Sequence, residues 1–177
     1  HPERAAAHAA DFAGFGPWLE ATYPALMAEM SRETVNGTLL YTWPGTDPSL
    51  DPILIMSHYD VVPVVPGTEA LWEHEPFSGD IADGFIWGRG TLDTKGSLIA
   101  SLEAADMLRA SGFRPVRTVM FSFGHDEEVG GPDGNETAAR LLADRGQLDF
   151  NQPVKEIWPE FAVNGKEETT VGMMLDH

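Results

Sequence analysis

Three short clusters of histidine and carboxylate side chains each follow a segment that the sequence predicts to be a β-strand. The clusters are Ser57-His58-Tyr59-Asp60, Gly88-Arg89-Gly90-Thr91-Leu92-Asp93 and Gly124-His125-Asp126-Glu127-Glu128. Divalent cations in proteins are bound by imidazoles and carboxylates that converge from several elements. The residue types therefore favour a metal-assisted hydrolase as the leading interpretation.

Each cluster also has an ordinary structural interpretation. Asp60 could orient the second ring nitrogen of a metal-binding His58, or both residues could belong to a plain strand-to-loop turn. The flanking glycines could bring Asp93 inward, or Asp93 or Thr94 could simply cap a helix. Glu127 and Glu128 repel each other unless a cation binds one of them, which leaves the other as a general base, but acidic surface loops are also common.

The elements around the clusters predict an α/β fold. Apolar runs and turn residues predict strands over 34–43, 52–57 and 117–123, and a hairpin over 77–88 with Asp83-Gly84 as its turn. Apolar spacing predicts helices over 3–30, 95–110 and 135–145. The first helix should be broken at Pro17 and Pro24. The second should have an apolar stripe that includes Leu108 and a C-cap at Gly112. This order indicates a parallel sheet, and ligands of such sheets bind beyond the carboxyl ends of the strands.

Composition narrows the classes of function. The 177 residues are enough for one domain with a core, and 42% of them are hydrophobic. A formal net charge of −17 disfavours nucleic acid and anionic lipid as partners. The absence of cysteine excludes disulfides, thiolate metal sites and a cysteine nucleophile. We see no apolar run of the length of a membrane helix and no signal peptide, so localisation in the cytoplasm, the periplasm or outside the cell stays open.

Taken together, the spacing and wording of the three clusters resemble a known family. Asp93 follows His58 by 35 residues, and Glu128 follows Asp93 by 35. The segments 57–64, 87–96 and 123–131 resemble three motifs of the aminoacylase and carboxypeptidase family of di-zinc metallopeptidases, in wording closest to its carboxypeptidase S and N-acyl-amino-acid hydrolase branch. The resemblance runs from about residue 12 to 150, whereas 151–177 diverges.

The resemblance implies a fold, a metal site and a reaction. The fold is a three-layer α/β sandwich with a mostly parallel central sheet flanked by helices. His58 would bind one zinc ion, Glu128 the other, and Asp93 would bridge them, with cobalt or manganese as alternatives. Asp60 would support His58, and Glu127 would be the general base that takes a proton from water and passes it to the leaving nitrogen of an amide. The family often has a cis peptide after the bridging aspartate, here Asp93-Thr94.

Part of the family pattern is missing from these 177 residues. A further acidic ligand is expected after the third motif, and Asp149, Glu156 and Glu160 are candidate substitutes. The resemblance also implies a late histidine, for which His177 stands too early, and a lid domain that would mediate any homodimer. We therefore expect residues 1–177 to be the N-terminal portion of the catalytic domain, truncated, without the lid and inactive alone.

Two hypotheses of different class follow. In the first, the chain belongs to a metal-dependent hydrolase that cleaves a C-terminal peptide bond or an N-acyl amino acid. In the second, it is a non-catalytic fragment or metal-free scaffold that retains the fold. A calcium-binding acidic module is a third option, and it predicts an oxygen-only site without His58.

Overall fold

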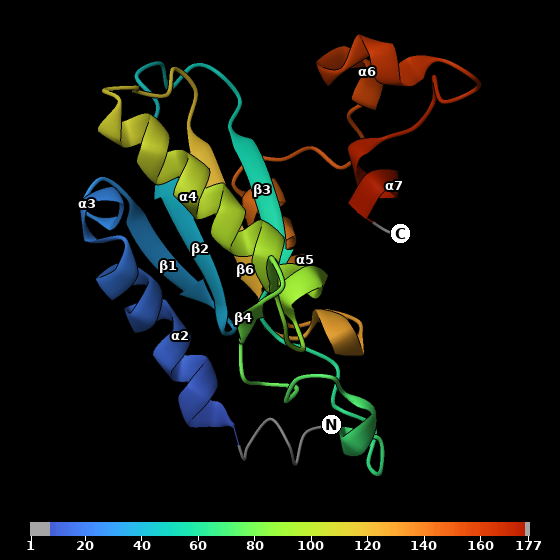
Figure 1. Ribbon diagram of the computed structural model, residues 1–177. Helices are drawn as coiled ribbons and strands as arrows, with labels where there is room; N and C mark the ends of the chain where they lie inside the picture. The colour runs from blue at the N-terminus through green and yellow to red at the C-terminus, as the bar shows by residue number, and fades with distance from the viewer. Residues whose placement is uncertain (1–7, 176–177) are drawn as a thin grey trace. The chain divides into compact units, whose positions relative to one another are not determined.

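The computed structural model describes residues 8–175 (Figure 1). The chain forms two compact units, His1–Ala138 and Ala139–His177. The first unit contains the main sheet and all three of the clusters that suggest a metal site. No helix within residues 8–175 is both long and apolar enough to cross a bilayer.

A four-stranded mixed sheet forms the centre of the first unit. Its strands are β1 (Ser31–Val35), β2 (Thr38–Trp43), β3 (Ile53–His58) and β6 (Val119–Gly124), in the spatial order β1-β2-β6-β3. The predicted α/β class is confirmed. The predicted parallel pairing holds between β3 and β6, whereas β1 with β2 and β2 with β6 pair antiparallel. The antiparallel pair β1–β2 is a hairpin, and a tight turn can join only antiparallel neighbours.

The segment predicted as one strand over 34–43 is therefore two strands. The chain turns at Asn36-Gly37, where both residues have positive φ angles of 49° and 99°. Asn-Gly is the dipeptide that two-residue hairpin turns prefer, because both positions must adopt left-handed backbone conformations. The sequence signal was present, and the prediction of a single strand was wrong.

The N-terminal helical region also differs in detail from the prediction. Helix α2 spans Ala9–Thr22 and α3 spans Pro24–Met27, while residues 3–7 lie outside the described residues. Pro17 lies inside α2 at an exposed position. Because proline has no N–H, the carbonyl one turn earlier in the helix lacks its usual donor, and water can take that place. Pro24 does separate the two helices, since it occupies the first position of α3.

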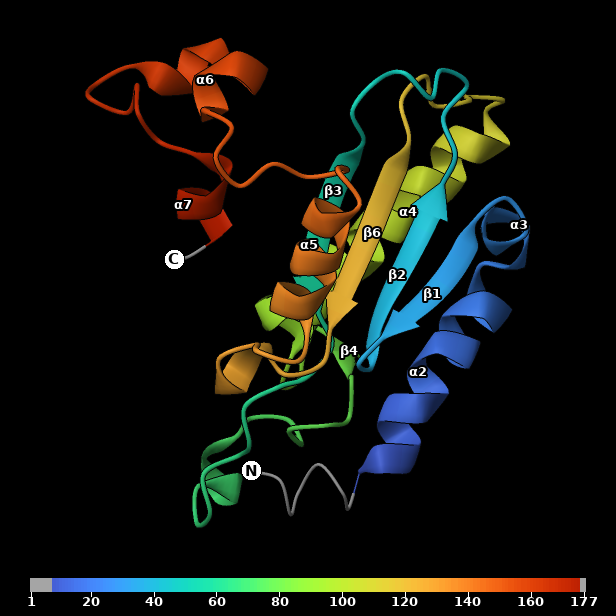
Figure 2. The ribbon, with the colours of Figure 1, turned by 180° about the vertical axis from the view of Figure 1, so that it is seen from behind.

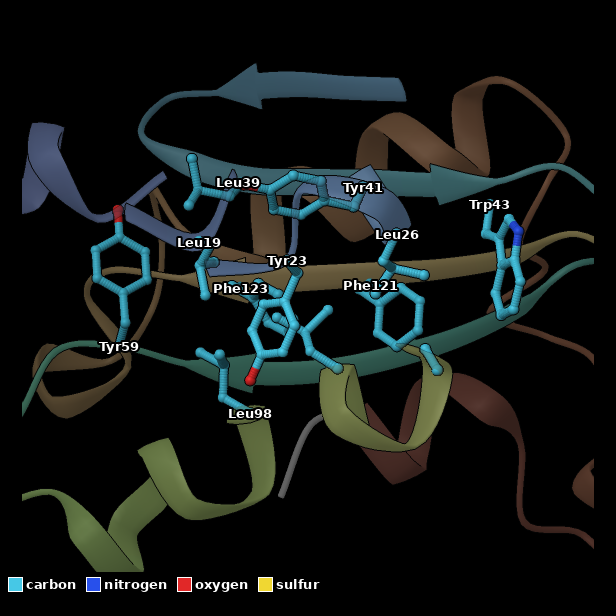
Figure 3. Close-up of a cluster of buried hydrophobic side chains, with 12 residues drawn as sticks. Leu19, Tyr23, Leu26, Leu39, Tyr41, Trp43, Tyr59, Leu98, Phe121 and Phe123 are labelled. Atoms are coloured by element: carbon cyan, nitrogen blue, oxygen red, sulfur yellow. The ribbon is translucent and has the colours of Figure 1, made fainter. Parts of the chain in front are cut away.

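Helix α4 (Gly96–Ala110) covers the same face of the sheet as α2 (Figure 1). Leu98 and Leu102 of α4 are fully buried, and they belong to one apolar cluster with β6. Figure 3 shows Leu98 with Phe121 and Phe123 of this cluster. Leu108, predicted on the same stripe, is 46% exposed. The helix ends as predicted near Gly112, whose φ of 87° suits the left-handed conformation that follows a helix.

The opposite face of the sheet meets the start of helix α5 (Asn135–Asp144), as the reverse view shows (Figure 2). Side chains alternate along a strand, so Ser122 points away from the face that holds Phe121 and Phe123. The Ser122 hydroxyl donates to Asn135 Oδ1 at 2.7 Å. Within the first unit, α2 and α4 cover one face of the sheet and the first turn of α5 meets the other, which agrees with the predicted three-layer arrangement.

Shorter elements complete the first unit. The predicted hairpin is formed by β4 (Ile81–Ala82) and β5 (Phe85–Ile86), with Asp83-Gly84 at its turn. A 3₁₀ turn spans Glu69–Leu71, and another spans Glu127–Val129. An irregular turn over Thr91–Lys95, in which Asp93 and Thr94 have non-helical backbone angles, leads into α4.

The second unit, residues 139–177, contains short helices after the end of α5. These are α6 (Val154–Ile157), a 3₁₀ turn (Pro159–Ala162) and α7 (Val171–Leu175), with an antiparallel bridge between Pro153 and Thr170. Asp149, Glu156 and Glu160 are all exposed within this unit. His177 lies outside the described residues.

Burial of the three tyrosines predicts an alkaline limit to stability. Loss of solvation raises the pKa of Tyr23 and of Tyr59 to about 12, and it also raises the pKa of Tyr41. Because the folded state favours the neutral phenols, the free energy of unfolding should fall as the pH rises from about 10 through about 12. Tyrosinate absorbance at 295 nm, recorded with and without urea, measures this. Folded protein that ionises all three phenols near pH 10 would contradict it.

Candidate metal centre

The parallel pair β3–β6 brings two of the three clusters to one edge of the sheet. His58 is the last residue of β3, and it stands opposite Gly124, the last residue of β6. The pairing continues one step further, because the Tyr59 N–H donates to the Gly124 carbonyl at 2.9 Å. The turn that carries Glu127 and Glu128 therefore begins beside the end of β3.

His58, Glu127 and Glu128 form a compact group of metal-ligating side chains. One ligand atom from each lies within 4.8 Å of the other two. The His58 residue is only 6% exposed, whereas the Glu127 side chain is 43% exposed. His58 Nε2 lies 3.6 Å from Glu127 Oε2, so the imidazole faces the acidic turn.

Asp60 links the other side of His58 to Glu128. Its Oδ2 accepts a hydrogen bond from the Glu128 backbone N–H at 3.0 Å, and its Oδ1 lies 3.2 Å from His58 Nδ1. That second contact is an ion-pair distance without hydrogen-bond geometry, so Asp60 Oδ1 is a buried acceptor without a hydrogen-bond partner. A carboxylate beside the second nitrogen is the usual neighbour of a metal-binding histidine.

Asp93 also reaches His58, from a turn that the glycines make possible. Its Oδ1 lies 3.2 Å from His58 Nε2, although Asp93 is not part of the group within 4.8 Å. Gly90 has a φ of 86°, and a Cβ there would lie 2.5 Å from Val61 Cγ1. The Asp93-Thr94 peptide is cis, as the resemblance implied. The alternative role of Asp93 or Thr94 as helix cap does not hold, because Lys95 occupies that position and no side chain caps the helix.

The site is electrostatically unbalanced toward negative charge. Asp60, Asp93, Glu127 and Glu128 surround one imidazole. Burial lowers the pKa of the Lys95 ammonium, while the charges of Asp60 and Glu128 act in the opposite direction. Lys95 therefore lies within the field of these carboxylates, and a bound cation would reduce their mutual repulsion further.

Asp126 shapes the turn that presents the two glutamates, a role that sequence reasoning missed. Its Oδ2 accepts the Asp133 N–H at 2.9 Å, and its backbone carbonyl accepts the N–H groups of Val129 and Gly131. A Cβ on Gly134 would overlap Asp126 Oδ1. An aspartate before a glycine-rich turn is a recognisable signal for such a brace.

Two other histidines and an Asn-X-Thr glycosylation sequence have partners outside the acidic group. His74 pairs with Asp80 at 3.1 Å and stacks on Trp87 with 4.6 Å between ring centroids. The His125 ring lies against Phe12 and Tyr59 rather than in the acidic group. The sequon at Asn135-Glu136-Thr137 has its Asn135 Nδ2 bonded to the Ser57 carbonyl at 2.8 Å, which occupies the nitrogen that a glycan would need.

These residues fit a divalent cation. A buried imidazole, two adjacent carboxylates and a buried carboxylate oxygen without a hydrogen-bond partner are suitable donors and supports for one. The participation of His58 disfavours the calcium option, since calcium takes oxygen ligands. The candidate substitutes Asp149, Glu156 and Glu160 lie in the second unit, so their roles stay predictions.

The mixed α/β sheet carries a histidine–glutamate group at the carboxyl edge of its parallel strands, and these side chains suit a divalent cation. Comparison with known families identifies the family that has this arrangement. A sequence model of peptidase family M20/M25/M40 matches residues 54–172. The chain belongs to this family.

Individual relatives agree with the predicted branch. The chain is 45% identical over 131 residues to carboxypeptidase S of Saccharomyces cerevisiae, which covers 72% of the chain and 23% of that protein. It is 42% identical over 142 residues to the human N-fatty-acyl-amino acid synthase/hydrolase PM20D1, covering 78% of the chain and 28% of that protein. The chain therefore spans about a quarter of the length of these curated relatives.

A solved structure shares the fold. The M20 family metallo-carboxypeptidase Sso-CP2 from Sulfolobus solfataricus superposes with a TM-score of 0.57 at 26% identity. The match covers 73% of this chain and 29% of that one. The sheet and its flanking helices are thus those of a known peptidase fold.

The Asp126 brace predicts that Gly134 tolerates no side chain. We expect Gly134→Ala to lower the free energy of unfolding by about 1–3 kcal/mol, because the new methyl group would overlap Asp126 Oδ1. Gly14→Ala is the matched control, since its Cβ meets nothing within 4 Å and α2 should gain about 0.5–1 kcal/mol. Urea unfolding measures both. Equal stability of the two variants would rule out the brace.

Proposed function

We propose that this chain is the N-terminal part of the catalytic domain of a zinc-dependent amide-bond hydrolase. The observation that carries the proposal is the buried His58, whose Nε2 faces Glu127 while Asp60 stands behind its Nδ1. Family membership supports hydrolysis of an amide bond. Because the chain spans about a quarter of its relatives' length, the reaction is assigned to the whole protein, as sequence reasoning expected.

In this proposal His58, Asp93 and Glu128 hold the metal. His58 would bind one ion, Glu128 would bind a second, and Asp93 would serve both, a role that its 3.2 Å approach to His58 Nε2 supports. Two zinc ions, or cobalt or manganese in their place, would supply a water of lowered pKa and polarise the substrate carbonyl. Any further ligands, for which Asp149, Glu156 and Glu160 are candidates in this chain, would complete the shell.

Glu127 is the proposed general base. Its carboxylate is partly exposed and directed toward the same space as the ring of His58, so it can reach both water and substrate. Glu127 accepts the proton that water loses on attack, and it then passes this proton to the nitrogen of the leaving group. Asp60 supports this chemistry without touching substrate, since it orients the His58 ring and holds the Glu128 backbone.

The names of the relatives indicate the substrate class. One is a carboxypeptidase and the other an N-fatty-acyl-amino acid synthase/hydrolase. Both names describe an amide bond to the nitrogen of an amino acid with a free carboxylate. We infer a small peptide or an N-acyl amino acid as substrate. A homodimer would form through a lid domain outside these residues.

The general base and the metal ligands can be separated by mutation. In the full-length protein, Glu127→Gln should keep its zinc but lose turnover by roughly 10²–10⁴, because the amide cannot accept a proton. His58→Ala should lose zinc as well as turnover. Zinc content by mass spectrometry and hydrolysis of an N-acyl amino acid measure the two properties. Full turnover in Glu127→Gln would remove Glu127 from the mechanism. Wild-type protein that contains no zinc would contradict the proposal and support the alternative hypothesis of a metal-free scaffold.

A further inference from the structure

Asn135 lies where it can control the separation of the two strand ends that carry the metal-binding residues. It is the first residue of α5 and belongs to the first unit. Its Nδ2 donates to the Ser57 carbonyl at 2.8 Å, and its Oδ1 accepts from the Ser122 hydroxyl at 2.7 Å. One amide group therefore bonds to both β3 and β6.

The two partners of Asn135 are close in sequence to the proposed site. Ser57 directly precedes His58, and Ser122 stands two residues before Gly124, where the turn toward Glu127 begins. Both serines are buried, with exposures of 9% and 1%, so water has little access to replace the amide. The contact is made from the face of the sheet opposite α4.

Gly124 completes this arrangement. A Cβ at position 124 would lie 2.9 Å from Asn135 Nδ2 and 3.0 Å from its Cγ. The amide thus packs directly on the backbone at the end of β6. An amide that bonds to β3, bonds to β6 and fills the space above Gly124 fixes the two strand ends relative to each other.

We propose that Asn135 is a positioning residue for the metal centre. It would hold the end of β3, and with it His58, at a fixed separation from the turn that carries Glu127 and Glu128. This inference rests on the proposed function, because it assumes that these side chains bind a metal ion. Asn135 acts through the backbone and the Ser122 hydroxyl and touches neither metal nor substrate.

Metal affinity tests the inference without an activity assay. Titration with Co²⁺, followed by visible absorbance, should show binding about tenfold to a hundredfold weaker in Asn135→Ala than in wild-type protein. Ser122→Ala should fall between the two, since it removes one of the two bonds. Ala138→Gly is the matched control, because it weakens the same helix at a buried position but leaves the amide in place. Its Co²⁺ affinity should equal that of wild type.

Each outcome of these titrations either supports or overturns the role of Asn135. Wild-type affinity in Asn135→Ala would overturn the inference, and so would an equal loss of affinity in Ala138→Gly, which would reveal a general effect of stability. If Asn135→Ala does not fold, Ser122→Ala takes its place, and wild-type affinity in that variant overturns the inference. Wild-type protein that binds no Co²⁺ would instead remove the proposed metal centre, and the inference with it.

Discussion

The parallel pairing of β3 with β6 is the constraint on which the site depends. It sets the ends of two strands side by side, with His58 opposite Gly124. Residues that lie more than sixty positions apart in sequence thereby share one edge of the sheet, as expected for ligand sites of parallel strands. The apolar cluster of α2, α4 and the sheet stabilises this pairing from one face, and Asn135 bonds to both strands from the other.

The polar groups at this edge of the sheet leave a local excess of negative charge. Four carboxylates surround His58. Asp60 accepts a hydrogen bond from the Glu128 backbone, and its other oxygen lies 3.2 Å from His58 Nδ1. Such a concentration of like charge opposes folding unless a cation compensates for it. The proposed metal ion would compensate for this charge, and it would explain why so acidic a turn follows a buried strand.

The sequence predicted the parts of the fold that depend on local pattern. The strands β3 and β6, helix α4 with its Gly112 end and the hairpin at Asp83-Gly84 follow from apolar periodicity and turn residues. The split of 34–43 at Asn36-Gly37 was also readable, but the apolar run around it masked the turn signal. Antiparallel pairing of β2 with β6 was not predictable in the same way, because strand order depends on contacts between distant segments.

For the site, the clusters predicted which residues gather but not what supports them. His58, Glu127 and Glu128 do come together, and Asp93 approaches His58. The role of Asn135 could not be derived from spacing, because its partners on β3 and β6 are brought close only by the fold. The role of Asp126 was readable from the glycine-rich turn that follows it, but sequence reasoning missed it.

The most direct test of the central claim is the response of His58 to zinc. Nuclear magnetic resonance of the histidine ring nitrogens can follow His58, His74 and His125 separately during a Zn²⁺ titration. The account predicts that Nε2 of His58 shifts to a metal-bound position, while His74 and His125 keep their metal-free signals. Saturating zinc that leaves His58 unchanged would contradict the metal centre.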